Sequence, residues 1–480
     1  MPAAPLARCA PEAQSVSSQS ILSFIESVEA KGFDIHGMML LRHGHVVAEG
    51  WWEPYDAKTA HMMFSLTKSF TSTAVGLAVS EGRLSLDDHV TSFFMDRLPA
   101  SPDPRLAALT VRHLLTMTTG QAQDILGPET SRNFDWVRDA LAVPFAHDPG
   151  TVFAYSSMAS HLAGAIVQRL TGQSLHEYLQ QRLFGPLGIA KVRWEECAPG
   201  VSIGGWGLSL RTEDIARFGQ LYLQRGIWNG RRLISEEWID QATSFQTPNG
   251  DDPQSDWNQG YGFQFWRCRH NIYRGDGAFG QFCIVMPEQD AVLAITSGVA
   301  DMQGVLNEVW EHLLPGMSAT PLAEDPRAAD MLRARLAKLE ASYPIGRPTS
   351  PTAALVNGKT YLMSGHPEAP ARIRYDFNHT GGVRAALEGC GYEDQVMAGG
   401  DQWTESGFDV FIGVAGRVLA RGAWVDESTY HARLRLVDTP FTFDTTVRFD
   451  NEGSVAVSTS RNVWFGPTEL ATVTGKWEES

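Results

Sequence analysis

Apolar residues recur at two spacings along the chain, and the order of these spacings predicts the fold. Through the middle of the chain they recur every three to four residues, which is typical of helices that pack by one face. Shorter apolar or alternating runs predict strands toward both ends of this region. The expected strands cover residues 37–50, 257–266, 283–286 and 291–295, and the expected helices cover residues 20–30, 69–79, 110–117, 136–141, 159–170, 175–183, 213–224 and 305–314. Strands from both ends must pair, so the pattern predicts an α/β (α+β) fold in which helices flank one antiparallel sheet.

The pattern changes after residue 315, which indicates more than one domain. Prolines then punctuate the chain around one charged helix, expected over residues 328–340, and short alternating runs between Gly, Asp and Asn turns follow. We therefore expect a flexible N-terminal lead over residues 1–18 and a first domain over residues 19–318. A linker with a helix should cover residues 319–352, and residues 353–480 should form a small all-β domain, either a sandwich or a barrel.

Charge and cysteine content indicate which partners and which cellular compartment to expect. The formal net charge of −16 disfavours binding to nucleic acid or to an anionic membrane surface. No stretch has the length and hydropathy of a membrane span, and the first residues do not resemble a secretory signal. The five cysteines are scattered without a paired motif, as in reduced proteins: Cys9, Cys197, Cys268, Cys283 and Cys390. We expect a cytoplasmic protein.

The stretch Phe64-Ser65-Leu66-Thr67-Lys68 carries the first candidate chemistry. It reads S-x-x-K at the start of a predicted helix, so Lys68 should lie one turn after Ser65 on the same face. A serine hydroxyl is a weak nucleophile until a neighbouring base removes its proton. A lysine held out of water loses its own proton more easily and can act as that base. Because Ser and Lys are common residues, this motif needs support from other parts of the chain.

That support comes from two further motifs. The order of the three motifs resembles their order in a known superfamily. Tyr155-Ser156-Ser157 and Gly275-Asp276-Gly277-Ala278 follow Ser65-Leu66-Thr67-Lys68 at the approximate spacing of the serine β-lactamase/DD-peptidase superfamily. The resemblance covers roughly residues 20–315 and is strongest to the class C-like branch, which includes β-lactamases, D-aminopeptidases, esterases, acyltransferases and nylon-oligomer hydrolases. It implies the β-lactamase/transpeptidase-like fold, with an all-helical subdomain beside the sheet.

The resemblance implies a role for each matching residue. Ser65 matches the acylated nucleophile, Lys68 its activating partner, and Tyr155 the residue that shuttles protons. Ser157 stands where the family usually has asparagine; it could bond Lys68 or substrate, or it could cap the helix that follows. The backbone N–H groups of Ser65 and Ala278 would form the oxyanion hole, because backbone donors need no particular side chain.

The third motif departs from the β-lactamase pattern. Gly275 stands where β-lactamases have lysine, and Gly277 and Ala278 anchor the alignment. Asp276 either pairs with a local arginine or points into the cleft, where it would favour substrates that carry an ammonium group. Trp206 lies in a glycine-rich loop and is a candidate for the substrate wall, although a tryptophan is more often part of a core. His61 and His113 are interpreted as structural, since S-x-x-K already supplies a base.

The expected function is that of a serine hydrolase that cleaves a small ester or amide through an acyl-enzyme on Ser65. The alternatives are a β-lactamase or acyltransferase of the same family, and a non-catalytic member that binds a ligand. The residues show no metal-ligand spacing and no nucleotide-binding loop in the required context, so no cofactor and no metal are expected. The oligomeric state is left open.

Overall fold

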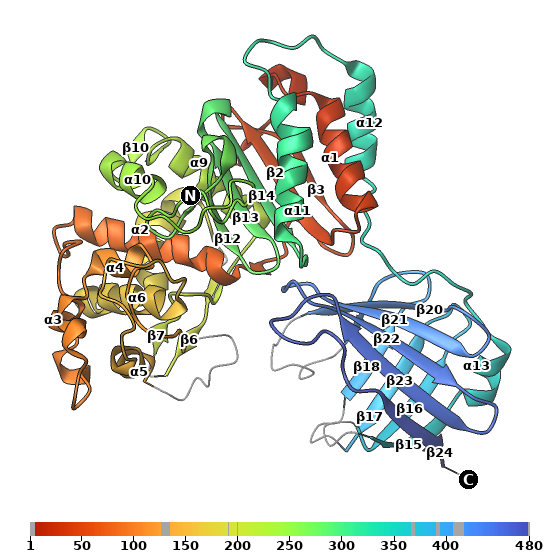
Figure 1. Cartoon of the computed structure of the whole chain (residues 1–480). Coiled ribbons are helices and arrows are strands. Elements are labelled where there is room, and N and C mark those ends of the chain that lie inside the picture. The colour runs from red at the N-terminus through yellow and green to blue at the C-terminus, as the bar shows by residue number, and fades with distance from the viewer. Residues whose placement is uncertain are drawn as a thin grey trace.

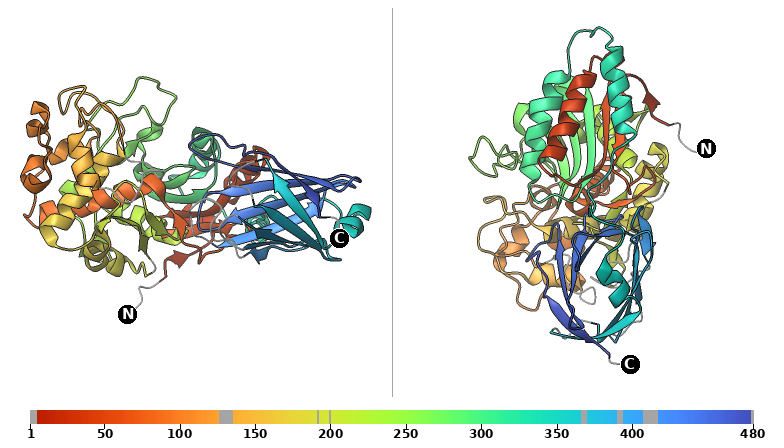
Figure 2. Two further views of the ribbon diagram at one scale, coloured as in Figure 1. Left: turned by 90° about the horizontal axis from the view of Figure 1, so that it is seen from below. Right: turned by 90° about the vertical axis from the view of Figure 1, so that its right-hand side faces the viewer.

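The computed structural model describes residues 5–125, 135–190, 192–198, 200–365, 370–389, 394–406 and 417–478. Figure 1 shows two bodies, a larger one with a sheet and helices and a smaller one made mostly of strands, with helix α13 at its side. The two views of Figure 2 place the C-terminus at the end of the smaller body that is remote from the larger one. This arrangement confirms the predicted fold class.

A seven-stranded sheet forms the centre of the larger body. Its strands are ordered β1-β3-β2-β14-β13-β12-β11, and every neighbouring pair is antiparallel except β1 with β3. Their bounds are β1 (Ala7–Arg8), β2 (Ile35–Arg42), β3 (His45–Trp51), β11 (Trp266–Arg267), β12 (Tyr273–Gly277), β13 (Gln281–Met286) and β14 (Ala291–Ser297). As predicted, the strands come from both ends of the region.

Helices cover both faces of this sheet, because its strands are apolar on both sides. Successive side chains of a strand point to opposite faces, so Met38 and Leu40 belong to one buried cluster while Met39 and Leu41 belong to the other. One face is covered by α1 (Ser18–Ala30), α11 (Met302–Glu308) and α12 (Pro326–Leu336) (Figure 1). The other face carries α9 (Thr212–Leu223) and α2 (Thr67–Ser80).

The helical subdomain packs against α2 on the second face. It contains α3 (Val90–Phe93), α4 (Val111–Leu115), α5 (Trp136–Ala142), α6 (Ser157–Thr171), α7 (Leu175–Leu179) and α8 (Gly185–Leu187), and α10 (Glu236–Thr243) lies nearby. Three short strands, β4 (His61–Met62), β8 (Leu208–Leu210) and β5 (Arg193–Trp194), form a small sheet. Two short hairpins complete this region: β6 (Glu196–Cys197) with β7 (Val201–Ser202), and β9 (Ile227–Trp228) with β10 (Arg231–Arg232).

The smaller body is a ten-stranded antiparallel near-barrel, preceded by α13 (Pro351–Val356). Its strands are β15 (Lys359–Ser364), β16 (Arg372–Phe377), β17 (Val383–Glu388), β18 (Asp394–Ala398), β19 (Thr404–Ser406), β20 (Val418–Trp424), β21 (Thr429–Leu436), β22 (Thr442–Phe449), β23 (Ser454–Arg461) and β24 (Val473–Trp477). The Gly399 N–H donates to Ala420 and the Gly399 carbonyl accepts from Gly422, so the two ends of the sheet meet beyond β18. Aromatic side chains fill the interior, among them Tyr361, Tyr375, Trp424 and Phe449.

Two segments differ from the predicted domain plan. Of the flexible lead expected over residues 1–18, residues 1–4 lie outside the described residues. Residues 5–18 include strand β1 and a 3-10 turn, Pro11–Gln14, and the Ser17 N–H donates to the Gly316 carbonyl. Within the expected linker, α12 packs on α1 and β3 through Leu332 and Leu336, and Leu339 packs beside it. The hydrophobic face of this helix needs a partner, and the sheet layer supplies one.

The strand expected over residues 257–266 is largely wrong. Only Trp266–Arg267 forms a strand, β11. Gly260 and Gln264 have positive φ angles of 102° and 65°, and such residues interrupt an extended chain. The alternating aromatics Tyr261, Phe263 and Phe265 are nevertheless all buried, so burial rather than strand geometry explains their spacing.

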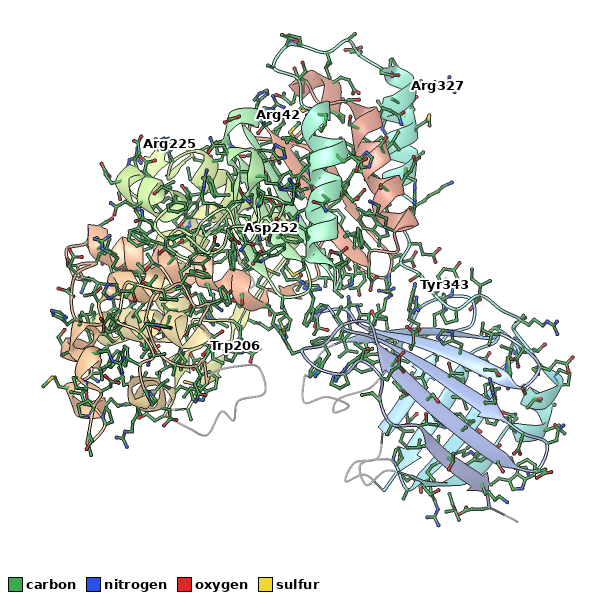
Figure 3. The ribbon with its side chains drawn as sticks, viewed as in Figure 1. Arg42, Trp206, Arg225, Asp252, Arg327 and Tyr343 are labelled. Atoms are coloured by element: carbon green, nitrogen blue, oxygen red, sulfur yellow. The ribbon has the colours of Figure 1, made fainter. Side chains whose placement is uncertain are left out.

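The two bodies share a buried polar contact and a short backbone contact. Arg435 of β21 donates to both carboxylate oxygens of Asp34, which precedes β2. The Met62 N–H of β4 donates to the Asp438 carbonyl in the turn between β21 and β22. Tyr343 lies at the junction (Figure 3), and its ring centroid is 3.5 Å from the Arg421 guanidinium carbon.

Two findings bear on the sequence expectations about membranes and cysteines. Among the described residues, none of the helices combines the length and the apolar character that crossing a bilayer requires. Cys9, Cys197, Cys268 and Cys283 are free thiols, and Cys390 lies outside the described residues.

Candidate active site

Ser65 and Lys68 lie at the junction of a short 3-10 turn, Phe64–Leu66 (η2), and helix α2. The turn places Ser65 at the partly exposed start of the helix, while Lys68 is buried, with 1% of its surface exposed. Helix α2 is enclosed on almost every side, which explains why its polar residues bond to neighbouring carbonyls. Ser69, Thr71 and Ser72, for example, donate to the carbonyls of Gln264, Gly204 and Phe263.

The Lys68 amine has three polar neighbours. Its Nζ lies 3.1 Å from Ser65 Oγ, 3.2 Å from Ser157 Oγ and 2.8 Å from the Gly205 carbonyl oxygen. Burial disfavours the ammonium form and lowers the pKa of Lys68 to about 7, although the charges of Asp124 and Asp276 partly oppose this shift. A substantial share of Lys68 is therefore neutral near pH 7 and able to accept a proton.

Tyr155 lies beside this pair. Its ring centroid is 4.9 Å from Lys68 Nζ, and the ring stacks on Trp266 at a centroid distance of 5.4 Å. Tyr155 has 37% of its surface exposed, but desolvation of its hydroxyl and the charge of Asp276 raise its pKa above the ordinary value, and a hydrogen bond with Ser65 opposes the shift. The phenol therefore stays protonated at neutral pH and can donate a proton to a basic atom.

Ser157 is available to Lys68 because its neighbour performs the capping role. Ser156 is the N-cap of α6, and its side chain accepts from the Ala159 N–H. Asp124 accepts hydrogen bonds from the Ser157 and Met158 N–H groups at the same helix end. Sequence reasoning missed Asp124. A carboxylate is favourable at a helix N-terminus, but this signal could identify Asp124 only once the position of the loop that carries it was known.

Gly277 lets the two segments that carry the expected oxyanion-hole donors approach closely. A side chain at this position would collide with the Met63 carbonyl and approach the Leu66 N–H, so the end of β12 lies directly against the turn that carries Ser65. Ser65 is in the first turn of its helix, where N–H groups lack partners within the helix. Ala278 follows the last residue of β12. Ser65 and Ala278 therefore lie on neighbouring segments, and their role as an oxyanion hole stays a prediction.

The structure corrects the expectation that Asp276 could present an unpaired carboxylate to substrate. Arg274 Nη2 lies 2.8 Å from Asp276 Oδ2, and Arg274 Nε donates to the same oxygen at 2.9 Å. Both side chains are buried on the same face of β12, because residues two apart on a strand point the same way. Burial raises the pKa of Asp276, and Arg274 opposes that shift. The interpretation of a local arginine pair is the one observed.

Gly275 faces helix α2 rather than open space. A Cβ atom there would lie 2.5 Å from Ser69 Oγ and 2.6 Å from Leu66 Cδ1. The close approach of β12 and α2 therefore requires glycine and leaves no room for a lysine. The position aligned with the β-lactamase lysine is structural in this chain.

Trp206 and the two histidines each have contacts of the kind found in a structural core. Trp206 has 7% of its surface exposed and packs on Trp136. It directly follows Gly205, whose carbonyl accepts from Lys68, so its place in the substrate wall stays a prediction. His113 accepts from the Thr110 N–H as part of a capping box. His61 contacts His36 between the two bodies, with 3.0 Å between ring nitrogens.

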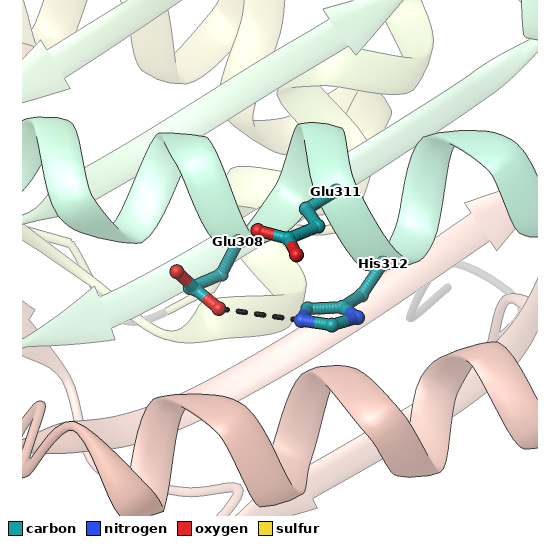
Figure 4. A group of neighbouring side chains, drawn as sticks. All are labelled: Glu308, Glu311 and His312. Carbon is teal, nitrogen blue, oxygen red and sulfur yellow. Dashed lines mark ion pairs between the residues drawn. The ribbon is translucent and has the colours of Figure 1, made fainter.

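One group of described residues has the composition of a metal site. Glu308, Glu311 and His312 lie on consecutive turns of α11 and the π-helical turn that follows, Val309–Leu313, and their side chains face one another (Figure 4). The Lys31 ammonium and the Ser27 hydroxyl of α1 already bond the buried Glu308 carboxylate. The cluster therefore joins α11 to α1, on the face of the sheet opposite to α2.

Fold and site together have the organisation of a hydrolase with a serine nucleophile, and comparisons with known proteins agree. The Beta-lactamase family model matches residues 25–305. The chain belongs to the beta-lactamase family, as the motifs predicted.

Three similar proteins show how far the likeness extends. The 6-aminohexanoate-dimer hydrolase of Paenarthrobacter ureafaciens is 25% identical over 288 residues, covering 55% of this chain and 72% of that protein. The lovastatin esterase of Penicillium rubens is 28% identical over 163 residues, covering 28% of this chain and 40% of that protein. The crystal structure of SurE matches 97% of this chain and 99% of its own, with 17% identity and a TM-score of 0.52, so the likeness in fold includes the near-barrel.

Proposed function

We propose that this protein is a serine hydrolase that cleaves a small ester or amide through an acyl-enzyme on Ser65. The observation that carries the proposal is the set of partners around Lys68. A neutral amine has two N–H bonds and one lone pair. The Gly205 carbonyl and Ser157 Oγ can accept the two N–H bonds. The lone pair is then directed to the Ser65 hydroxyl, 3.1 Å away.

Acylation follows from this arrangement. Lys68 accepts the Ser65 proton as Ser65 Oγ bonds to the substrate carbonyl carbon, and the carbonyl oxygen becomes an oxyanion. The N–H groups of Ser65 and Ala278 stabilise that charge. The bond to the leaving alcohol or amine then breaks, and the leaving atom takes a proton through Tyr155, which Lys68 replenishes. Water attacks the acyl-enzyme in the second half by the reverse transfers and releases the acid.

The substrate class rests on the relatives and on the third motif. A 6-aminohexanoate-dimer hydrolase and a lovastatin esterase are among the proteins similar to this chain. A β-lactam would bring a carboxylate, whereas the position of the β-lactamase lysine is Gly275, and the nearby Arg274 is buried in its pair with Asp276. A substrate carboxylate would find no free cation at these two positions, so anionic substrates are disfavoured relative to neutral esters and amides.

A fluorophosphonate probe followed by intact-mass measurement tests the proposal, together with a hydrolysis screen of p-nitrophenyl esters, aminoacyl amides and a chromogenic cephalosporin. Wild-type protein should gain one adduct on Ser65 and hydrolyse an ester or an amide. Ser65→Ala should lose the adduct and lower turnover by several orders of magnitude.

Ser80→Ala, at the other end of the same helix, is the matched control and should retain both activities. Turnover by a folded Ser65→Ala protein would contradict the acyl-enzyme. A wild-type protein that neither reacts with the probe nor hydrolyses any substrate would support the alternative of a ligand-binding member.

A further inference from the structure

The two residues that flank the oxyanion-hole donors have unusual backbone conformations. Phe64 directly precedes Ser65 and has φ 45°, and Phe279 directly follows Ala278 and has φ 66°. Positive φ is unfavourable for a bulky side chain, so neighbouring contacts must hold it. The peptide group between Phe64 and Ser65 carries the Ser65 N–H, and Phe279 is joined directly to Ala278. The backbone conformations of these two phenylalanines therefore help to fix where Ser65 and Ala278 lie.

The near-barrel supplies contacts that hold both rings. Phe64 and Phe279 pack edge to face with centroids 5.6 Å apart. Phe441, just before β22, lies 6.2 Å from Phe64 and 5.9 Å from Phe279. Phe465, between β23 and β24, lies 5.7 Å from Phe64 and 4.9 Å from Phe279. Two aromatic side chains of the second body thus contact both flanking residues of the first.

Hydrogen bonds to backbone carbonyl groups hold the segments beside Phe64 and Phe279 in place. The Phe279 carbonyl accepts from the Val299 N–H at 3.0 Å and from the Ser297 hydroxyl at 3.0 Å. The Asn462 side chain of the near-barrel donates to the Gly298 carbonyl at 2.9 Å. Near Phe64, the Met62 N–H donates to the Asp438 carbonyl of the near-barrel at 2.8 Å. The loops that carry Phe441 and Phe465 are therefore docked at both strands beside the site.

We infer that the near-barrel positions the oxyanion hole of the first body through Phe441 and Phe465. This inference rests on the proposed function and extends it: the two phenylalanines are positioning residues that hold Phe64 and Phe279 in their left-handed conformations. Without these contacts the flanking residues can relax toward negative φ, which displaces Ser65 and Ala278, and their N–H groups with them, from one another. Ground-state binding of a small ester depends little on those N–H groups, whereas the transition state depends on them strongly.

Phe465 is the informative position for a test, because half of its surface is exposed and its removal leaves the barrel core intact. The full-length wild type is compared with Phe465→Ala, with Phe465→Tyr, which keeps the ring, and with Leu362→Ala. Leu362 of β15 is equally exposed, at 49%, and lies outside the aromatic group. The substrate is p-nitrophenyl acetate, and phenylboronic acid, which forms a tetrahedral adduct with a serine, serves as inhibitor.

Phe465→Ala should lower kcat about tenfold, less than the loss caused by deleting an oxyanion-hole donor, while KM stays nearly unchanged. Binding of the boronic acid should weaken in parallel. Phe465→Tyr and Leu362→Ala should both behave like wild type.

The outcomes separate the inference from the proposed function. An active wild type with an unchanged kcat in Phe465→Ala overturns the inference alone. A rise in KM at constant kcat also overturns it, because Phe465 would then only contact substrate. An equal loss in Leu362→Ala would indicate general loosening of the barrel and contradict it as well. A wild type that never acylates overturns both.

Discussion

Arg435, near the end of the chain, and Asp34, near its start, form an ion pair that joins the two bodies. Arg435 Nη1 lies 2.9 Å from one carboxylate oxygen of Asp34 and 3.0 Å from the other. Arg435 has 1% of its side chain exposed and Asp34 has 19%. Arg435 also donates to the Ser342 carbonyl and to the Tyr55 hydroxyl, so one guanidinium bonds the first body, the connecting segment and the near-barrel.

Arg435→Met should therefore destabilise the full chain strongly. Removing one partner of a buried pair leaves the other charge unpaired, which costs about 3–5 kcal/mol. Arg433→Met is the matched control, since Arg433 lies two residues earlier on β21 and pairs with Asp444 nearer the surface, where the loss should be about 1 kcal/mol or less. Urea unfolding at pH 7 measures both variants. Equal losses would show that the pair contributes no more than a surface contact.

The same pair predicts how stability depends on pH. Arg435 and His36 lower the pKa of Asp34 below its usual range and outweigh the effect of burial. Because the folded-state pKa is depressed, the stabilisation is fully present above the unfolded value of about 3.9 and is lost as pH falls through the folded value. Wild-type stability should thus fall more steeply than that of Arg435→Met below about pH 4. Parallel curves for the two proteins would contradict this linkage.

Lys68→Met and Tyr155→Phe should each slow acylation by about 10²–10⁴-fold, as expected for loss of a proton-transfer partner. Since both side chains serve one chain of proton transfers, the double variant should be little slower than the slower single variant. Single-turnover kinetics with a p-nitrophenyl ester measure the acylation step directly. Losses that multiply in the double variant would mean that the two residues act independently.

The pH dependence of kcat/KM should show an ascending limb with a midpoint near the Lys68 pKa of about 7, because only the neutral amine accepts the Ser65 proton. No descending limb from Tyr155 is expected below about pH 10, since its pKa lies above the ordinary value.

The negative charge of Asp124 raises the Lys68 pKa, so Asp124→Asn should move this midpoint to lower pH. Asp139→Asn, on helix α5, is the control and should leave the profile in place. A midpoint that moves upward in Asp124→Asn, or that does not move, would contradict the electrostatic role of Asp124.

Gly275→Lys should not convert the protein to a β-lactamase. The new side chain would meet Ser69 and Leu66 where β12 approaches α2, and such overpacking costs about 1–3 kcal/mol or more. We expect a lower melting temperature, weaker ester hydrolysis and no gain with a chromogenic cephalosporin. Ala278→Ser, beside the same strand end, should be tolerated far better. Efficient cephalosporin turnover by a stable Gly275→Lys protein would show that the site can hold a lysine after all.

Local sequence patterns predicted the helices and strands that carry the site. They failed where segments distant in the sequence determine the surroundings of a side chain. S-x-x-K at a helix start placed Lys68 one turn from Ser65, as observed. The Arg274–Asp276 pair needed the register of β12, which places both residues on one face. The glycine-rich loop indicated a place in the substrate wall for Trp206 but gave no sign of its contact with Trp136 of helix α5. The contact between Phe465 and Phe64 joins positions far apart in the chain, so no local sequence pattern could predict it.

The contact between the near-barrel and the Phe64 turn also has a consequence for the order in which the protein is made. Ribosomes synthesise Ser65, Lys68, Tyr155 and Ala278 long before Asp438, Phe441 and Phe465. A nascent or prematurely terminated chain can therefore hold every reacting group and still lack the contacts that orient the oxyanion hole. On this view the proposed hydrolytic activity can begin only after the segment that carries Phe465 has been synthesised and has folded against the first body.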